Sequence, residues 1–453
     1  MKTHGKCVFV FLTGDIMNNS LSLSKLIPVS LVLFSSFFGA GNLLFPPLFG
    51  YLSGSNLNIA TLGFCITGVG LPILGVLAIA MTGGNDLTEV AAPVNIAYAK
   101  IIMFVSSMSI GPLFAIPRTA AFSYEIGIKP LFGTTEPWQL ALYSALYFAF
   151  SYYVANNPSK VLNWLGKVLT PALLVCLVIL FVKVLLAPSF TPGAPQGEYL
   201  NAPFLKGFQE GYNTMDLLAS FLFGAATLTT IKTFGIENKK MLIRACLWAG
   251  LITAGLLAFI YYFLGYAGAE AHRYLSGEFS NGAGILVATA HEYLGSGGTL
   301  ILSAIIILAC LTTSIGLIAA ISDYFHLLFN KKLSKQTFGM LIALLSFSLS
   351  NFGLDMIIKM AIPILCFLYP VMIALALLNV FGFGGNKRVF RCTMWIVTLF
   401  AIVEGLKAAA IPVPMESILS SVPLYDEGFG WFTAAVMGAA VGVIWDRMKG
   451  ATE

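Results

Sequence analysis

Three clusters of small and polar residues interrupt an otherwise apolar chain, and binding chemistry is expected at these places. The first is Gly39-Ala40-Gly41-Asn42, which is followed closely by Pro46-Pro47. Glycine and proline remove helix propensity, and a helix broken inside a bilayer offers carbonyl and N–H groups to ions and charged ligands. The glycines could instead simply permit close helix packing. Asn42 beside them favours a binding site.

The second cluster repeats this pattern between Asp216 and Thr230, where Gly224 stands among small and hydroxyl-bearing residues. We expect a helix break near Gly224. Interrupted helices at corresponding positions of two halves are typical of the binding site of inverted-repeat transporters. The side chains predicted to line an apolar pocket there are Phe37, Phe221, Phe223 and Gly224.

The third cluster is Ala309-Cys310-Leu311-Thr312-Thr313-Ser314, with three adjacent hydroxyl groups. Hydroxyl and carbonyl oxygens are the ligands that hard cations require. Such hydroxyls also commonly bond back to carbonyls of their own helix, which is an equally good interpretation here.

Few charged residues fall inside the apolar segments, among them Arg118 and Asp216. Arg118 follows Pro117 and has no carboxylate near it in sequence before Glu125. An arginine within a membrane segment is a functional candidate by default, either as a gate or as a substrate contact. No metalloprotease, serine-hydrolase or nucleotide-binding motif occurs, so an enzyme is not indicated.

The composition indicates that these clusters lie in a membrane protein. Of 453 residues, 58% are hydrophobic and 10% are charged, whereas soluble proteins carry about 25% charged residues. A transmembrane helix uses about 20 apolar residues, so the sequence predicts an all-α polytopic membrane protein with about twelve helices. The net charge of +5 is too small to suggest nucleic acid. The predicted spans are 26–49, 59–81, 96–122, 137–155, 161–186, 214–232, 243–267, 297–328, 337–352, 355–381, 391–411 and 430–446.

The basic residues predict the orientation of these spans. With both termini in the cytoplasm, most of the 25 Lys and Arg residues lie in inner segments, and only Lys129, Lys206 and Arg273 lie in outer loops, as the positive-inside rule requires. The short apolar stretch 284–293 cannot span the membrane and predicts a surface helix or lid. The predicted divisions are a cytoplasmic tail (1–24), a first repeat (25–187), an extracellular loop (188–213), a second repeat (214–381) and two further helices with a tail (382–453).

Three motifs together resemble the bacterial branched-chain amino acid:cation symporter family. They are Gly39 to Pro47, Ile110 to Thr119 and Ile307 to Leu317. The resemblance implies a leucine-transporter-like fold, with a five-plus-five inverted repeat and two extra helices, in the bacterial inner membrane. It also implies import of leucine, isoleucine and valine with Na⁺ or H⁺ as the coupling ion. Methionine or another apolar amino acid is an alternative substrate, and a channel is a less favoured function.

The resemblance also implies roles for individual residues. Ala309, Thr312 and Thr313, with the carbonyls of Ser35 and Phe38, are expected to hold Na⁺. The N–H groups around Ala40 and Gly41 are expected to receive the substrate carboxylate, and Asn42 matches a residue that serves a second sodium site in relatives. Na⁺ is favoured over H⁺ because the cluster between the first and eighth helices has no titratable group. Substrate and lipid are the expected partners, and no obligate protein partner is evident. The sets named are Phe37, Ala40, Gly41, Asn42, Phe221, Phe223 and Gly224 for substrate, Ser35, Phe38, Ala309, Thr312 and Thr313 for Na⁺, and Arg118 as a possible gate.

Overall fold

The computed structural model describes residues 22–83, 87–132, 136–156, 170–186, 191–413 and 416–450, and within these ranges the chain is helical with no strand. Six helices are long and apolar enough to cross a membrane, or seven if one bent pair counts as a single span. The prediction of a polytopic helical protein is confirmed, whereas the number twelve stays a prediction. The tail 1–21 and residues 161–169 of the expected fifth span lie outside the described residues.

The α-helices of the described residues follow one another along the chain. In order they are α2 (Leu23–Phe37), α3 (Ala40–Ser53), α4 (Leu57–Cys65), α5 (Leu71–Thr82), α6 (Leu87–Ala91), α7 (Ile96–Met108), α8 (Ala115–Gly127), α9 (Lys129–Phe132), α10 (Pro137–Asn156), α12 (Thr170–Leu185), α13 (Pro203–Glu210), α14 (Asp216–Lys232), α15 (Lys239–Glu270), α16 (Gly282–Leu328), α17 (Lys335–Ser350), α18 (Leu354–Val380), α19 (Lys387–Ala408), α20 (Glu416–Leu419) and α21 (Gly430–Gly450).

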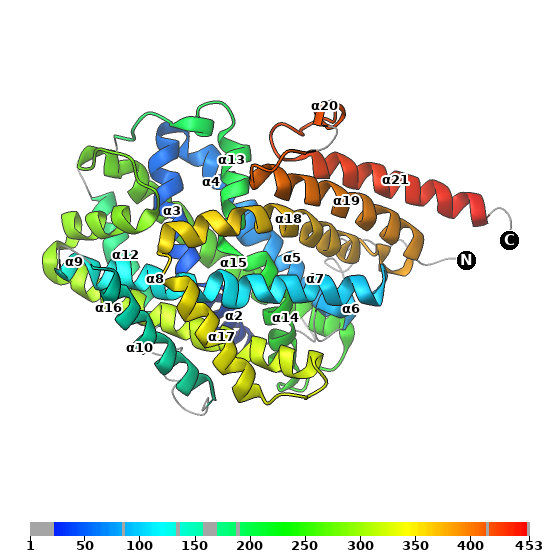
Figure 1. Cartoon of the computed structure of the whole chain (residues 1–453), viewed down its shortest axis with the longest axis horizontal. Helices are drawn as coiled ribbons and strands as arrows, with labels where there is room; N and C mark the ends of the chain where they lie inside the picture. The colour runs from blue at the N-terminus through cyan, green and yellow to red at the C-terminus, as the bar shows by residue number, and fades with distance from the viewer. Residues whose placement is uncertain are drawn as a thin grey trace.

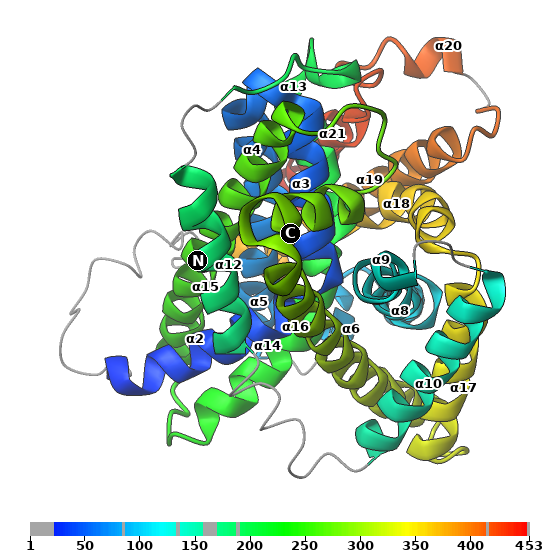
Figure 2. The ribbon, with the colours of Figure 1, turned by 90° about the vertical axis from the view of Figure 1, so that its left-hand side faces the viewer.

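The interior of the bundle is built from α3, α5, α8, α14, α15 and α16. Helix α15 packs along both α2 and α3, α16 packs on α8, and α14 packs on α5. Helices α19 and α21 pair at one side of the molecule, beyond α18 (Figure 1). Helices α10 and α17 pair at another edge (Figure 2). The breaks described next lie in this interior, since Phe38 and Met215 are both buried.

The first predicted span is broken where the sequence predicts it. Helix α2 ends at Phe37, and α3 begins at Ala40 after two residues outside the helical region of backbone conformation, Phe38 and Gly39. The Asn42 side chain caps the new helix, because its Oδ1 accepts the N–H of Gly39 at 2.9 Å. The break thus leaves the amino end of α3 and the carboxyl end of α2 facing each other in the interior.

The second break exists, but its predicted position near Gly224 is wrong. The bend lies at Met215, where a short 3-10 helix (Gly211–Thr214) after α13 meets α14 at 49°. Met215 has φ of 63°, a left-handed conformation that a non-glycine residue rarely adopts. Gly224 lies within the continuous helix α14, where a Cβ would meet Val76 Cα of α5 at 3.1 Å. It is a packing glycine, which is why its presence misled the prediction.

Residues 188–213 were expected to form an extracellular loop, but α13 and the 3-10 helix already lie within them. The broken helix that contains α14 therefore starts at Pro203, earlier than the predicted 214. Its first half is weakly apolar and contains Lys206 and Glu210, which form an ion pair at 3.5 Å. These charges obscured the helix in the sequence.

A further break interrupts the third predicted span, which the sequence treats as continuous over 96–122. Between α7 and α8 lies a π-helical turn (Ser109–Leu113), in which Gly111 leaves the helical conformation with φ −95° and ψ −125°. Phe114 follows with φ −133°. Pro112 contributes, since proline has no N–H and displaces the preceding turn. As a result, α8 begins as a separate helix at Ala115, beside the first two breaks.

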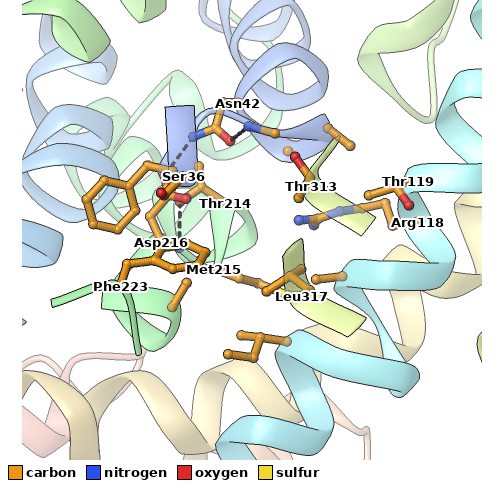
Figure 3. A pocket seen from close by; sticks show the side chains of 17 residues that line it. Ser36, Asn42, Arg118, Thr119, Thr214, Met215, Asp216, Phe223, Thr313 and Leu317 are labelled. Atoms are coloured by element: carbon orange, nitrogen blue, oxygen red, sulfur yellow. Dashed lines mark hydrogen bonds between the residues drawn. The ribbon is translucent and has the colours of Figure 1, made fainter. Parts of the chain in front are cut away.

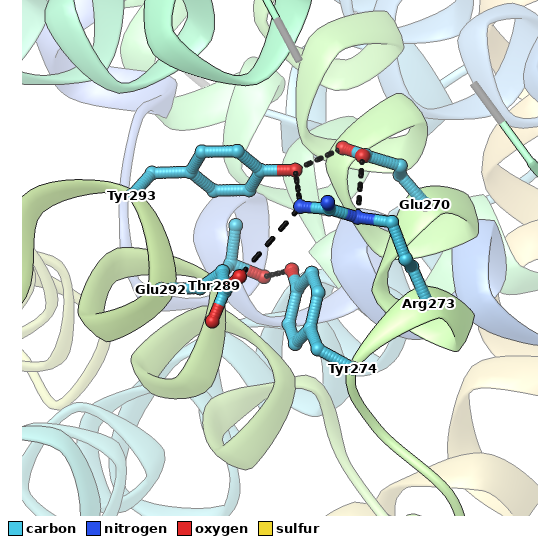
Figure 4. Close-up of polar contacts among 6 residues, drawn as sticks. All are labelled: Glu270, Arg273, Tyr274, Thr289, Glu292 and Tyr293. Carbon is cyan, nitrogen blue, oxygen red and sulfur yellow. Dashed lines mark hydrogen bonds and ion pairs between the residues drawn. The ribbon is translucent and has the colours of Figure 1, made fainter. Parts of the chain in front are cut away.

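The stretch predicted as a surface helix is helical and forms the first part of α16. Gly295, with φ 65° and ψ −174°, separates residues 282–294, here called the lid helix, from the rest of α16. A polar network joins the lid helix to the end of α15 (Figure 4). Tyr293 OH donates to Glu270 Oε2 at 2.6 Å, Arg273 Nη2 donates to Tyr293 OH at 3.1 Å, and Arg273 Nε lies 3.3 Å from Glu270 Oε1.

Glycines bring the backbone of α3 unusually close to its neighbours. A Cβ built on Gly268 of α15 would lie 2.1 Å from the Pro47 carbonyl oxygen, and one on Gly282 of the lid helix would lie 1.9 Å from the Leu44 carbonyl oxygen. Gly50 meets the Gly265 carbonyl in the same way, at 2.0 Å. We call these three contacts the glycine seam. It holds α3, α15 and the lid helix together at backbone distance.

Candidate functional site

The three breaks meet around one cavity (Figure 3). It lies between the carboxyl end of α2, the amino ends of α3 and α14, the start of α8 and the middle of α16. The residues that line it are Ser36, Phe37, Gly39, Ala40, Gly41, Asn42, Ile110, Ala115, Arg118, Thr119, Thr214, Met215, Asp216, Ala219, Phe223, Thr313 and Leu317.

One wall of the cavity is a polar cluster centred on the Asp216 carboxylate. Asn42 Nδ2 donates to Asp216 Oδ2 at 2.7 Å, and Tyr261 OH donates to the same oxygen at 3.1 Å. Asn42 Nδ2 also contacts the Tyr261 hydroxyl. All three side chains are buried. Asn42 thus links the break in the first helix to the break at Met215, because one side chain bonds both Gly39 and Asp216.

The opposite wall carries the Arg118 guanidinium, which extends from α8 into the cavity (Figure 3). The side chain is only 4% exposed. Its Nη1 donates to the Asn213 carbonyl at 2.6 Å, and its Cζ lies 5.3 Å from the centroid of the Phe45 ring. A Cβ on Gly41 would lie 2.8 Å from Nη2, so glycine is what admits the guanidinium to the amino end of α3.

The hydroxyl cluster predicted to hold Na⁺ lies next to the first break. A Cβ on Gly39 would meet Thr313 Oγ1 at 3.1 Å. Thr312 Oγ1 and Thr313 Oγ1 both donate to the Ala309 carbonyl, at 2.8 and 3.2 Å. Both interpretations of the sequence are therefore compatible with this geometry, since both hydroxyls bond back to their helix and the Thr313 oxygen still lies beside the break at Gly39. Ser35 and Phe38, whose carbonyls were expected to complete the site, lie at the end of α2.

The cavity is apolar at its other end. The rings of Phe37 and Phe223 meet edge to face with centroids 5.7 Å apart, and Leu317 and Ile110 lie on the same lining. Of the residues predicted to contact substrate, five line the cavity and two, Phe221 and Gly224, do not. Those that line it are Phe37, Ala40, Gly41, Asn42 and Phe223.

Five polar members of the site are absent from the predicted sets: Ser36, Thr119, Thr214, Asp216 and Tyr261. For Asp216 a signal existed, because a carboxylate inside an apolar segment is costly and marks function. It was noticed but given no role, since the expected break lay eight residues further along. Tyr261 carries no comparable signal, because a tyrosine in an apolar helix is ordinary.

A family model described as branched-chain amino acid transport protein matches residues 22–449. The branched-chain amino acid permease BraB of Bacillus subtilis (strain 168) is 40% identical over 94% of this chain and 97% of its own length. The branched-chain amino acid permease BrnQ of Escherichia coli (strain K12) is 35% identical over 96% of this chain and 98% of its own length.

Solved structures with the same fold are transporters of low sequence identity. Mhp1, a nucleobase-cation-symport-1 family transporter, in a closed conformation, matches with a TM-score of 0.60 at 13% identity, over 95% of each chain. MhsT in complex with L-phenylalanine matches with a TM-score of 0.53 at 17% identity, over 94% of this chain and 98% of that one. These confirm the predicted leucine-transporter-like fold, and the relatives are permeases and not enzymes. The chain therefore belongs to the branched-chain amino acid transport protein family.

Proposed function

We propose that this chain imports leucine, isoleucine and valine by symport with Na⁺ across the bacterial inner membrane, with both termini in the cytoplasm. The observation that carries the proposal is the cavity at the meeting point of the breaks in the first and sixth predicted spans, which joins an apolar lining to the amino end of α3. Relatives at 35–40% identity that are named as branched-chain amino acid permeases support the substrate class. The distribution of basic residues supports the orientation.

In this proposal the substrate carboxylate lies at the amino end of α3 and its side chain lies toward Phe37 and Phe223, which line the apolar end of the cavity. The N–H groups of Ala40 and Gly41 belong to the first turn of α3, which has no intrahelical acceptors for them and carries a partial positive charge. An apolar pocket separates side chains that differ by one methylene by only about 1–3 kcal/mol. Methionine is therefore an alternative substrate.

The coupling ion would bind between α2 and α16. The oxygens available to it are the Ala309 carbonyl, the hydroxyls of Thr312 and Thr313, and the carbonyls of Ser35 and Phe38. The approach of Gly39 to Thr313 supports this assignment, because it places the end of α2 against the hydroxyl cluster. An all-oxygen neutral set suits a hard monovalent cation.

The driving force is sufficient for accumulation by alternating access. A tenfold gradient of a monovalent cation supplies about 1.4 kcal/mol, and a membrane potential of 100 mV adds about 2.3 kcal/mol per charge. Together these would support several-hundred-fold accumulation of a neutral amino acid.

Uptake of labelled leucine into proteoliposomes tests the proposal. An inward Na⁺ gradient is expected to raise the initial rate of uptake and to drive transient accumulation, and valine and isoleucine are expected to compete. Liposomes without protein and liposomes with equal Na⁺ on both sides are the controls. Absence of uptake under both Na⁺ and H⁺ gradients would refute symport.

The ion site is tested by Thr312→Ala compared with Ser303→Ala in the same helix. Ser303 donates to the Ile126 carbonyl at 3.0 Å and does not line the cavity. Loss of a ligand oxygen for a cation is expected to raise the half-saturating Na⁺ concentration about tenfold or more, whereas Ser303→Ala should leave it unchanged. Equal effects of the two substitutions would contradict the assignment.

Coupling to H⁺ is the second candidate, and Asp216 is the observation that favours it. The expectation of Na⁺ relied on the absence of a titratable group from the first and eighth helices, yet Asp216 bonds to Asn42 of the first helix at 2.7 Å. A pH gradient imposed without Na⁺ distinguishes the two ions. Uptake driven by that gradient in the unmodified protein would assign the coupling to H⁺.

A further inference from the structure

The cavity contains two charged side chains among its lining residues, and they have opposite signs: Arg118 and Asp216. Each is 4% exposed. No ion pair joins them, although both side chains belong to the described part of the chain. Charges buried within a membrane protein are costly and are retained for function. Each of these two side chains can therefore bind an oppositely charged group of a ligand.

Arg118 presents one edge of its guanidinium without a protein partner. Nη1 is held by the Asn213 carbonyl, whereas Nε, which is fully buried, has no hydrogen-bond partner in the described structure. Nε and Nη2 form the edge that binds a carboxylate through two parallel hydrogen bonds. Nη2 lies beside Gly41, at the amino end of α3. That edge and the helix end share a preference for an anion.

Asp216 likewise uses only part of its carboxylate. The donors from Asn42 and Tyr261 both go to Oδ2. These two hydrogen bonds orient the group, with the Thr214 side chain as a third polar neighbour. A carboxylate has about four acceptor positions, so acceptor capacity remains for a ligand. A carboxylate oxygen held in this way at a cavity wall prefers a donor that carries positive charge.

We infer that Arg118 and Asp216 together recognise the two charges of a zwitterionic α-amino acid. Arg118 binds the substrate carboxylate at the amino end of α3, and Asp216 binds the substrate ammonium group. This inference rests on the proposed function and adds to it the residues that select for an α-amino acid. A neutral zwitterion compensates both buried charges at once, whereas a ligand with only one charge leaves the other without a partner.

Leucine analogues that lack one charged group test the inference in the unmodified protein. 4-Methyl-2-oxopentanoate keeps the carboxylate and side chain without the ammonium group, and 3-methylbutylamine keeps the ammonium group without the carboxylate. Loss of one partner of a buried charged pair costs several kcal/mol, so each analogue is expected to bind roughly 100-fold more weakly than leucine. Binding to purified full-length protein is measured by calorimetry and by ligand-induced thermal shift.

Two variants test the roles of Asp216 and Arg118 separately. Asp216→Asn is expected to weaken leucine binding about 100-fold and to leave the affinity for 4-methyl-2-oxopentanoate unchanged or higher. Arg118→Gln is expected to weaken leucine to the same extent and to leave the affinity for 3-methylbutylamine unchanged. Glu404→Gln and Arg388→Gln, in α19 and away from the cavity, are the matched controls and should bind leucine as the unmodified protein does.

Three results would overturn the inference. The first is an unmodified protein that binds either analogue as tightly as leucine, which can be read even if a variant fails to fold. The second is Asp216→Asn weakening leucine and both analogues in equal proportion, which would make the residue structural. The third is Asp216→Asn keeping leucine affinity while losing uptake driven by a pH gradient, which would make it the proton carrier. If the unmodified protein neither binds nor takes up leucine, the proposed function itself fails, and this outcome differs from all three.

Discussion

The glycine seam gives the sharpest prediction about stability, through the substitution Gly268→Ala. The new Cβ would lie 2.1 Å from the Pro47 carbonyl oxygen, 2.8 Å from its carbonyl carbon and 2.9 Å from its Cα. Ordinary contact begins at 3.4 Å, so α15 and α3 must separate by about 1.3 Å, the difference between 3.4 and 2.1 Å. The obstacle is backbone, so no side-chain rotation can relieve it.

Overpacking of this kind costs about 1–3 kcal/mol, and a backbone obstacle places Gly268→Ala near the upper end. At about 2–4 °C per kcal/mol for a large domain, the midpoint of thermal unfolding should fall by roughly 4–12 °C. A fluorescence thermal-shift assay on detergent-purified protein measures it. The control is Gly255→Ala in the same helix, where a Cβ meets nothing within 4 Å. That variant should be unchanged or more stable by up to about 1 kcal/mol, because alanine favours helix over glycine. Equal midpoints for the two variants would refute the close approach of α15 and α3.

Two further predictions concern the apolar lining and the lid helix. Phe223→Leu replaces a ring that lines the cavity with a smaller side chain, and it should shift the ratio of uptake rates for methionine and valine in favour of methionine by about tenfold. Phe221→Leu, at a buried position outside the cavity, should not shift this ratio. Equal shifts in competition assays would place the side-chain pocket elsewhere. Tyr293→Phe removes the hydroxyl that donates to Glu270 at 2.6 Å, so amide hydrogen exchange in residues 282–294 should speed up several-fold while exchange in α18 stays constant. Unchanged exchange in the lid helix would show that the network of Figure 4 does not hold it in place.

Much of this fold follows from the sequence, because apolar length and glycine–proline interruptions act locally. The break at Gly39 is predictable, since two glycines, an asparagine and two prolines lie within nine residues. The break at Met215 is not, because methionine is a good helix former and takes its left-handed conformation from its surroundings. Gly224 shows the converse error, because a glycine that serves helix packing has the same sequence signature as one that serves a bend.

Some residues of the candidate site could likewise be predicted from the sequence, and others could not. Asn42 and Thr313 lie within recognisable motifs, so their place at the cavity could be anticipated. The contact of Asp216 with Asn42 spans 174 positions of the chain, and that with Tyr261 spans 45. Such pairings depend on where α14 starts and on how α15 lies against α3. Neither can be read from a local pattern, so the partner of a lone buried carboxylate appears only in the folded chain.

Two of the three breaks around the cavity, those at Gly39 and Met215, differ in the conformational energy they hold. Gly39 is extended, a conformation that costs little for any residue. Met215 is held in the left-handed region, at a cost of about 1 kcal/mol or more. A rearrangement that returns Met215 to right-handed geometry would release that energy, whereas none is stored at Gly39. The α13–α14 bend therefore stores conformational energy in this state, and the α2–α3 bend stores little.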